Sequence, residues 1–146
     1  MVSTEDTRRD YRELLFFTPG LGDFISGVIL FEETLKRKSA AGVPLAEVLR
    51  SQGIVPGIKV DKGTVPLAEF PGETLTQGLD GLAQRLAEYK PLGARCAKWR
   101  AVINVGAGIP TPQVIESNAH ALARYAAICK AQGVVSIVEP RDTNGG

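Results

Sequence analysis

Cysteine and histidine are scarce in this sequence, which has two cysteines and one histidine among 146 residues. Cys96 and Cys129 lie far apart and in no Cys-x-x-Cys spacing, so they indicate two reduced, buried thiols rather than a redox pair or a thiolate metal site. Because His120 is the only histidine, a zinc site built from two histidines is excluded, and a histidine-dependent nucleophile has one candidate base. We therefore expect no metal and no cofactor. Any chemistry must rest on lysine, arginine, glutamate and aspartate.

Long apolar runs and an excess of one charge are missing as well. No stretch approaches the roughly 18 apolar residues that a membrane span needs, and the segment after Met1 is polar, unlike the core of a signal peptide. The 17 lysines and arginines face 16 acidic residues, so the net charge of +1 provides no basic field for a nucleic acid. We therefore expect a cytoplasmic protein with neither a membrane nor a nucleic acid as its partner.

The sequence does contain enough apolar material, 44% of its residues, for the core of one domain or of part of a larger one. Strand-like and helix-like segments alternate, and the short apolar strands are of the type buried on both faces, which predicts a parallel α/β fold. The predicted strands are 27–31, 54–60, 96–105 and 134–138. The predicted helices are a first one that Thr4 or Asp6 caps and that ends before Pro19, then 44–52, 82–89 and a long one between Pro110 and Gly133.

Finer features follow from the same patterns. Residues 63–78 are rich in Pro, Gly and Thr and predict a long loop that is functional or disordered. Residues 141–146 are typical of a frayed, flexible tail. In the longest helix the predicted buried stripe consists of Ile115, Ala119, Leu122, Ala126 and Cys129. Arg8, Arg9 and Arg12 of the first helix are interpreted as a solvated face.

Charged residues gather where the predicted strands end. Lys98 and Arg100 are two residues apart, so they point to one side of their strand while Trp99 points to the other. Because ligands of parallel α/β folds bind at the carboxyl ends of the strands, we expect Lys59, Lys98, Arg100 and Glu139 to converge on a site for a phosphorylated or carboxylated small molecule. The alternative is that these charges reach water or pair internally.

Two further motifs carry weaker functional interpretations. Gly106-Ala107-Gly108 follows a strand and precedes a helix, as in a dinucleotide-binding loop, but Thr111 stands where a third glycine belongs, which favours an ordinary loop. His120 has no polar cluster beside it in the sequence, so a place on the helix surface or at the margin of the core is favoured over a catalytic base.

Six segments carry a resemblance that extends over nearly the whole chain: Gly27–Leu35 (GVILFEETL), 57–63 (GIKVDKG), 76–82 (TQGLDGL), 97–100 (AKWR), 122–126 (LARYA) and 137–140 (IVEP). In order and spacing they are similar to class I fructose-bisphosphate aldolase, a metal-independent, Schiff-base-forming family with a TIM-barrel fold. The resemblance implies reversible cleavage of fructose 1,6-bisphosphate into dihydroxyacetone phosphate and glyceraldehyde 3-phosphate, in glycolysis and gluconeogenesis.

The same resemblance implies roles for four residues. Glu139 resembles the glutamate that moves protons during carbinolamine formation and carbon–carbon cleavage. Lys98 resembles the lysine that assists this chemistry and stabilises developing charge. Lys59 and Arg100 resemble cations that hold the sugar bisphosphate. Arg141 stands where the family has a second glutamate.

The resemblance further implies that residues 1–146 form one partial barrel domain, truncated at both ends. A complete TIM barrel takes about 250 residues, and this chain matches only the second through fifth strands, a half barrel of about four parallel strands. The catalytic aspartate of the first strand would precede Met1, and the Schiff-base lysine would follow Gly146.

A half barrel has two unpaired sheet edges and one face that the missing strands would cover. We therefore expect self-association or a complementary chain at these edges, and we expect no aldolase activity from the isolated chain. The alternative function is a non-catalytic half barrel that binds sugar phosphates or serves as an interaction module.

Overall fold

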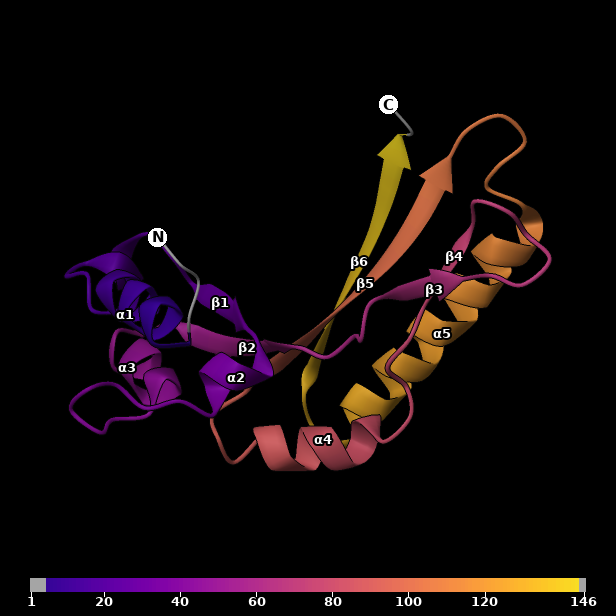
Figure 1. Cartoon of the computed structure of the whole chain (residues 1–146). Coiled ribbons are helices and arrows are strands. Elements are labelled where there is room, and N and C mark those ends of the chain that lie inside the picture. The colour runs from indigo at the N-terminus through magenta and orange to yellow at the C-terminus, as the bar shows by residue number, and fades with distance from the viewer. Residues whose placement is uncertain (1–4, 145–146) are drawn as a thin grey trace. The chain divides into compact units, whose positions relative to one another are not determined.

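The computed structural model describes residues 5–144, and the chain divides into two units (Figure 1). The first unit contains the described residues up to Lys59 together with Glu88–Cys96, and the second contains Val60–Ala87 together with the described residues from Ala97 onward. Within residues 5–144 no helix combines the length and the apolar composition that crossing a bilayer needs.

The first unit has a pair of parallel strands covered by short helices. Its elements are α1 (Glu5–Phe16), a 3-10 turn η1 (Leu21–Asp23), β1 (Gly27–Leu30), α2 (Glu32–Leu35), α3 (Leu45–Ser51) and β2 (Val55–Lys59). β1 and β2 pair in parallel, from Gly27 opposite Val55 to Leu30 opposite Ile58. Leu45, Val48 and Leu49 of α3 are buried, as the predicted helix at 44–52 requires.

Gly57 lies in the middle of β2, where a side chain does not fit. A Cβ atom at this position would lie 2.6 Å from Cys96 Sγ and 2.6 Å from Ile29 Cδ1. Both neighbours are side chains packed against the strand, so the absence of a Cβ atom is what allows this close approach. Glycine is weakly strand-forming, and its presence here is explained by packing.

The second unit contains a hairpin, two long strands and the longest helix. Its elements are β3 (Thr64–Pro66), β4 (Thr74–Thr76), most of α4 (Leu82–Tyr89), β5 (Cys96–Val105) from its second residue, α5 (Pro112–Ala131) and β6 (Val135–Asn144). β5 and β6 are hydrogen-bonded neighbours, and Figure 1 shows that they run in the same direction with α5 between them in the chain. This is the β–α–β connection of a parallel sheet.

Tyr125 joins α5 to both strands of this sheet. Its ring is fully buried beside the Trp99 ring, with 5.3 Å between the ring centroids. Its hydroxyl donates to the Ala97 carbonyl (2.6 Å) and accepts from the Ile137 amide (3.2 Å). Trp99 thus packs on the opposite side of β5 from Lys98 and Arg100, as the alternation along the strand predicts.

The predicted buried stripe of the long helix is displaced by one residue at four of its five positions, and Cys129 is buried as predicted. The buried residues of α5 are Val114, Asn118, Ala121, Tyr125 and Cys129. Ile115 is 49% exposed, and Ala119 is exposed. Two residues with polar groups face the core because they find partners there: the Tyr125 hydroxyl bonds to both strands, and the Asn118 amide donates to the Thr74 carbonyl (3.2 Å).

The long loop predicted for residues 63–78 is also wrong, because most of this segment is a hairpin. β3 and β4 pair antiparallel, from Thr64 opposite Thr76 to Pro66 opposite Thr74. The carboxylate of Glu73, which is buried, accepts from the Thr111 amide (2.7 Å) and the Thr111 hydroxyl (2.6 Å). Thr111 is the N-cap residue of α5, so the hairpin is fixed to the start of that helix.

The bounds of the last strand and of the first helix differ from the prediction. β6 continues through residues 141–144, which the sequence predicts as a tail, while 145 and 146 lie outside the described residues. α1 begins at Glu5, so Asp6 lies within the helix, and the other predicted cap, Thr4, also lies outside the described residues.

Burial on both faces is wrong for the first and last predicted strands. Ile29 is 38% exposed, Val135 is 68% exposed and Val138 is 45% exposed. Among the described residues β1 pairs only with β2, and β6 pairs only with β5, so one edge of each strand has no neighbouring strand. Apolar side chains there remain in contact with solvent.

We predict that Gly57→Ala destabilises the chain by about 1–3 kcal/mol, because the new methyl group overpacks the contact with Cys96 and Ile29. Gly106→Ala is the matched control, since a Cβ atom there has its nearest neighbour at 3.5 Å, an ordinary contact. Urea unfolding of both variants measures the difference. Equal stability of the two variants would contradict this account of Gly57.

Candidate functional site

The structure brings together three of the four predicted site residues on neighbouring strands. Lys98 and Arg100 lie on β5 and Glu139 lies on β6. Glu139 Oε1 accepts from Arg100 Nε (3.2 Å) and lies 3.2 Å from Arg100 Nη2, while Glu139 Oε2 contacts Lys98 Nζ. One carboxylate is therefore shared by two cations, with one cation on each of its oxygens.

The local sequence explains this arrangement. Residues 98 and 100 share one side of β5 because side chains alternate along a strand, and two cations so close would repel each other without a carboxylate opposite. The adjacent strand β6 supplies that carboxylate. The side chains of Lys98, Arg100 and Glu139 are 17%, 35% and 33% exposed, so the group is partly desolvated and still open to a ligand.

The two cations hold Glu139 in its charged form. The hydrogen bond from Lys98 lowers the pKa of Glu139, partial desolvation opposes this, and the hydrogen bond and charge of Arg100 lower the pKa further, so that it lies below the ordinary value. At neutral pH the carboxylate is therefore ionised and able to accept a proton.

Lys59 ends β2 in the first unit. Its Nζ lies 6.0 Å from the centroid of the Phe31 ring, at the edge of the range for a cation–π contact. Phe31 follows β1 directly, so the two side chains come from the ends of paired strands.

Arg8 and Arg12 are not the simple solvated face that the sequence predicts. Arg8 Nη2 lies 3.4 Å from Glu33 Oε2, Arg12 Nη1 lies 3.3 Å from Glu33 Oε1, and Arg37 Nε lies 3.8 Å from the same oxygen. Desolvation would raise the pKa of Glu33, but the charges and hydrogen bonds of Arg8 and Arg12 outweigh it and lower the pKa. The ion pairs of Arg8 and Arg12 connect α1 with α2. The sequence does not reveal them, because their partners lie more than twenty residues apart.

Two residues that hold the main chain of the site were assigned no role from the sequence. Asp61 Oδ2 accepts from the Arg100 amide (3.3 Å), and the Thr76 hydroxyl donates to the Arg100 carbonyl (2.8 Å). Both residues lie in segments that resemble the family, which is the one signal that the sequence contained.

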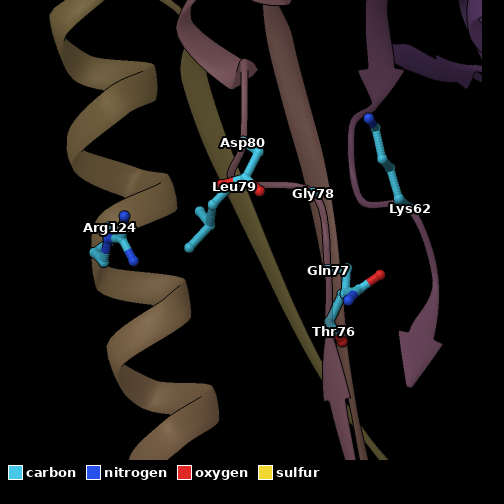
Figure 2. A pocket seen from close by; sticks show the side chains of 7 residues that line it. All are labelled: Lys62, Thr76, Gln77, Gly78, Leu79, Asp80 and Arg124. Atoms are coloured by element: carbon cyan, nitrogen blue, oxygen red, sulfur yellow. The ribbon is translucent and has the colours of Figure 1, made fainter.

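The second unit also has a cavity of about 330 Å³ beside α5 (Figure 2). Its lining residues, labelled in Figure 2, include Arg124 of the helix, Lys62 of the segment after β2, and Leu79 and Asp80 of the loop after β4. A neighbouring cavity of about 430 Å³ includes His120, which is exposed on α5. Lys98, Arg100 and Glu139 line neither cavity.

The described residues contain two free cysteines and no cluster of metal-binding side chains. Cys96 is half-buried and Cys129 is buried, both are free, and burial raises the pKa of each thiol, so both are neutral at neutral pH. Within residues 5–144 no group of three or more His, Cys, Asp or Glu side chains is placed to hold a metal ion.

Comparisons with known proteins give one consistent result. The family model of fructose-bisphosphate aldolase class I matches residues 1–145. The chain is 62% identical over 138 residues to a probable fructose-bisphosphate aldolase class 1 of Xanthomonas campestris pv. campestris, covering 94% of this chain and 41% of the relative. It is 58% identical over 138 residues to the cytoplasmic isozyme of fructose-bisphosphate aldolase of Spinacia oleracea, covering 94% and 39%.

A solved structure agrees with the sequence relatives. Fructose-bisphosphate aldolase of Plasmodium falciparum, in a ternary complex with TRAP and a small-molecule inhibitor, matches with a TM-score of 0.93 and 53% identity over 95% of this chain and 41% of that chain. The predicted fold class, a parallel α/β partial TIM barrel, is thereby confirmed. The chain spans about two fifths of the length of the relatives it matches.

We predict that Glu139 stabilises the folded chain in a pH-dependent way. Because its pKa is lowered on folding, its contribution is complete above the ordinary carboxyl pKa and is lost as the pH falls through the lowered pKa. The unfolding free energies of the wild type and Glu139→Gln, measured with urea from about pH 7 to about pH 3, should therefore converge as the pH falls.

Glu116→Gln is the control for this measurement, because Glu116 is exposed on α5 and away from Lys98 and Arg100. The change in the difference with pH should be larger for Glu139→Gln than for this control. A difference between wild type and Glu139→Gln that is independent of pH would contradict the shared ion pair.

Proposed function

Because the chain belongs to the class I fructose-bisphosphate aldolase family, we propose that it supplies part of an active site that reversibly cleaves fructose 1,6-bisphosphate into dihydroxyacetone phosphate and glyceraldehyde 3-phosphate. The observation that carries the proposal is the group of Lys98, Arg100 and Glu139 on β5 and β6. It places two cations and one ionised carboxylate on one side of the sheet, where a phosphorylated sugar and its reacting centre require them.

Each residue has a role that its chemistry supports. Glu139, ionised at neutral pH, accepts a proton from the substrate and returns it later in the reaction. Lys98 holds an ammonium group beside this carboxylate and stabilises negative charge that develops on a substrate oxygen. Arg100 and Lys59 bind phosphate, and the planar guanidinium of Arg100 can satisfy the carboxylate and a phosphate oxygen at the same time.

The nucleophile of the reaction must come from elsewhere. The family resemblance places the imine-forming lysine in a later strand, and this chain spans about two fifths of its relatives. Lys98 has a different role in the family resemblance, and its Nζ is already engaged by Glu139. Catalysis therefore requires the remaining part of the barrel.

Exposed apolar side chains on β6 support an association that supplies this part. Val135, Ile137 and Val138 are 68%, 38% and 45% exposed, although strands of this composition are normally covered. A complementary chain is the partner that fits the proposed activity, because a second copy would repeat the same strands without adding the lysine. The cytoplasmic isozyme among the relatives supports the cytoplasm, and glycolysis, as the setting.

The second candidate function is binding of sugar phosphates without catalysis. Two facts favour binding without catalysis. The chain contains the group of Lys98, Arg100 and Glu139, and the resemblance assigns it no imine-forming lysine. Two experiments test these functions: the first measures the binding that both require, and the second measures whether this chain by itself forms the imine.

The first experiment is calorimetry with fructose 1,6-bisphosphate. We predict millimolar binding that weakens with added salt, since phosphate contacts to cations are screened. Arg100→Gln should weaken binding roughly tenfold, the loss expected for one charge-assisted contact. Lys130→Gln is the matched control, because Lys130 is an exposed cation in the last turn of α5. No salt-sensitive binding by the wild type would refute both candidate functions.

The second experiment is reduction with borohydride in the presence of dihydroxyacetone phosphate, followed by measurement of the intact mass. We predict no adduct on Lys59, Lys62 or Lys98 of the isolated, folded chain, and an adduct on an intact family member treated in parallel. An adduct on one of these lysines would overturn the dependence on a complementary chain and would revive a stand-alone enzyme.

A further inference from the structure

We propose that Asp61 and Thr76 are positioning residues for Arg100, which hold its two main-chain polar groups so that its guanidinium stays against Glu139. The inference rests on the proposed function, since it concerns the site to which Arg100 belongs. Both residues bond to the main chain of Arg100, so each would act through the placement of β5.

After β2 the chain bonds to β5 first through its main chain and then through a side chain. The Val60 amide, one residue after β2, donates to the Lys98 carbonyl of β5 (3.1 Å). The next partner of β5 is a side chain: Asp61 Oδ2 accepts from the Arg100 amide (3.3 Å). The carboxylate thus replaces a main-chain carbonyl at the point where the chain turns away.

Asp61 is held in this position by its surroundings. It is 8% exposed, and its other oxygen accepts from the Gly63 amide (3.2 Å), which fixes the turn that follows. Gly78 packs against this turn so closely that a Cβ atom would lie 3.1 Å from the Lys62 nitrogen. A buried carboxylate with both oxygens bonded to amides has little freedom to move.

The carbonyl of Arg100, which lies on the same edge of β5 as its amide, is bonded by β4. The hydroxyl of Thr76, which is 3% exposed, donates to the Arg100 carbonyl (2.8 Å). Two residues earlier, the Thr74 hydroxyl donates to the Val102 carbonyl (3.2 Å). Two side-chain hydroxyls of β4 therefore bond to the carbonyls of every second residue along one edge of β5.

Main-chain hydrogen bonds join the segments of the two positioning residues. The Lys62 amide donates to the Gln77 carbonyl and the Gln77 amide donates to the Gly63 carbonyl, both at 2.9 Å. The turn with Asp61 and the strand with Thr76 are thus bonded to each other next to Arg100. Arg100 is the one residue of β5 among those described whose amide and carbonyl both bond to side chains in these contacts.

The two main-chain bonds determine the direction in which the Arg100 side chain projects. A strand residue projects its side chain nearly perpendicular to the sheet, so a shift or rotation of the peptide moves the end of a long side chain by more than the peptide itself. Two bonds on the main chain keep Arg100 Nε and Nη2 at 3.2 Å from Glu139 Oε1. Release of either bond should separate the guanidinium from the carboxylate.

The experiment is an NMR titration of the Glu139 carboxyl carbon in glutamate-labelled chain, with the signal assigned by its loss in Glu139→Gln. We expect Thr76→Val to raise the pKa of Glu139 toward its ordinary value, because the bond from Arg100 weakens. Thr76→Ser, which keeps the hydroxyl, should restore the low pKa. Thr74→Val deletes an equivalent hydroxyl bond two residues away and should leave the pKa unchanged.

Asp61→Ala tests the role of Asp61 through the direction in which the pKa of Glu139 changes. Loss of a nearby negative charge by itself lowers the pKa of a carboxyl group, whereas release of Arg100 raises it. We expect a rise. A fall or no change would overturn the role of Asp61, and equal effects of Thr76→Val and Thr74→Val, with equal losses of stability in urea, would overturn that of Thr76.

This titration needs no substrate, so its result is independent of the proposed function. Calorimetry with fructose 1,6-bisphosphate on the same variants completes the test, and Thr76→Val should weaken binding about threefold or more while Thr76→Ser and Thr74→Val do not. A wild type that shows the low pKa of Glu139 but binds no sugar bisphosphate would contradict the proposed function and leave the positioning intact.

Discussion

Two cations two residues apart on one side of β5 require a carboxylate between them, and the site depends on this constraint. Lys98 and Arg100 would repel each other in a partly desolvated group, and Glu139 of β6 resolves the repulsion by giving one oxygen to each. The same arrangement keeps the carboxylate ionised and orders both cations before a ligand arrives. Preorganised charge of this kind lowers the cost of binding a phosphorylated substrate.

Several contacts in the second unit hold β5 and β6 so that Glu139 stays opposite Lys98 and Arg100. Tyr125 bonds to Ala97 and Ile137, one residue on each strand, and packs its ring on Trp99 behind the charged group. The hairpin of β3 and β4 bonds to β5 through Thr74 and Thr76, and Glu73 fixes it to the N-cap of α5. Tyr125, Thr76 and Glu73 are buried, and a buried polar group left without its partner would be costly. These bonds therefore oppose movement of β5 relative to α5 and the hairpin.

The sequence predicted the regular elements well where their signals are local. The bounds of β5 at 96–105 and α4 at 82–89 were predicted to the residue, and α3 and β2 within one or two residues, because Gly, Pro and continuous apolar runs mark them. The hairpin within 63–78 was missed, since strands of three residues are too short for alternation to be visible. Four of the five stripe residues of α5 were misplaced by one position, because Asn118 and Tyr125 carry polar groups whose hydrogen-bond partners, which let them be buried, lie far away in the sequence.

The sequence by itself determined the alternation of strands and helices, the side of β5 that Lys98 and Arg100 share, and the family to which the motifs belong. These depend on periodicity, on strand geometry and on residue identity, all of which are local. The tertiary structure alone decided that one carboxylate is shared by two cations, that Arg8 and Arg12 bind Glu33, and that Asp61 and Thr76 hold the peptide of Arg100. Hydrogen bonds and ion pairs between residues more than twenty positions apart depend on distance in the fold, and no spacing along the chain encodes that distance.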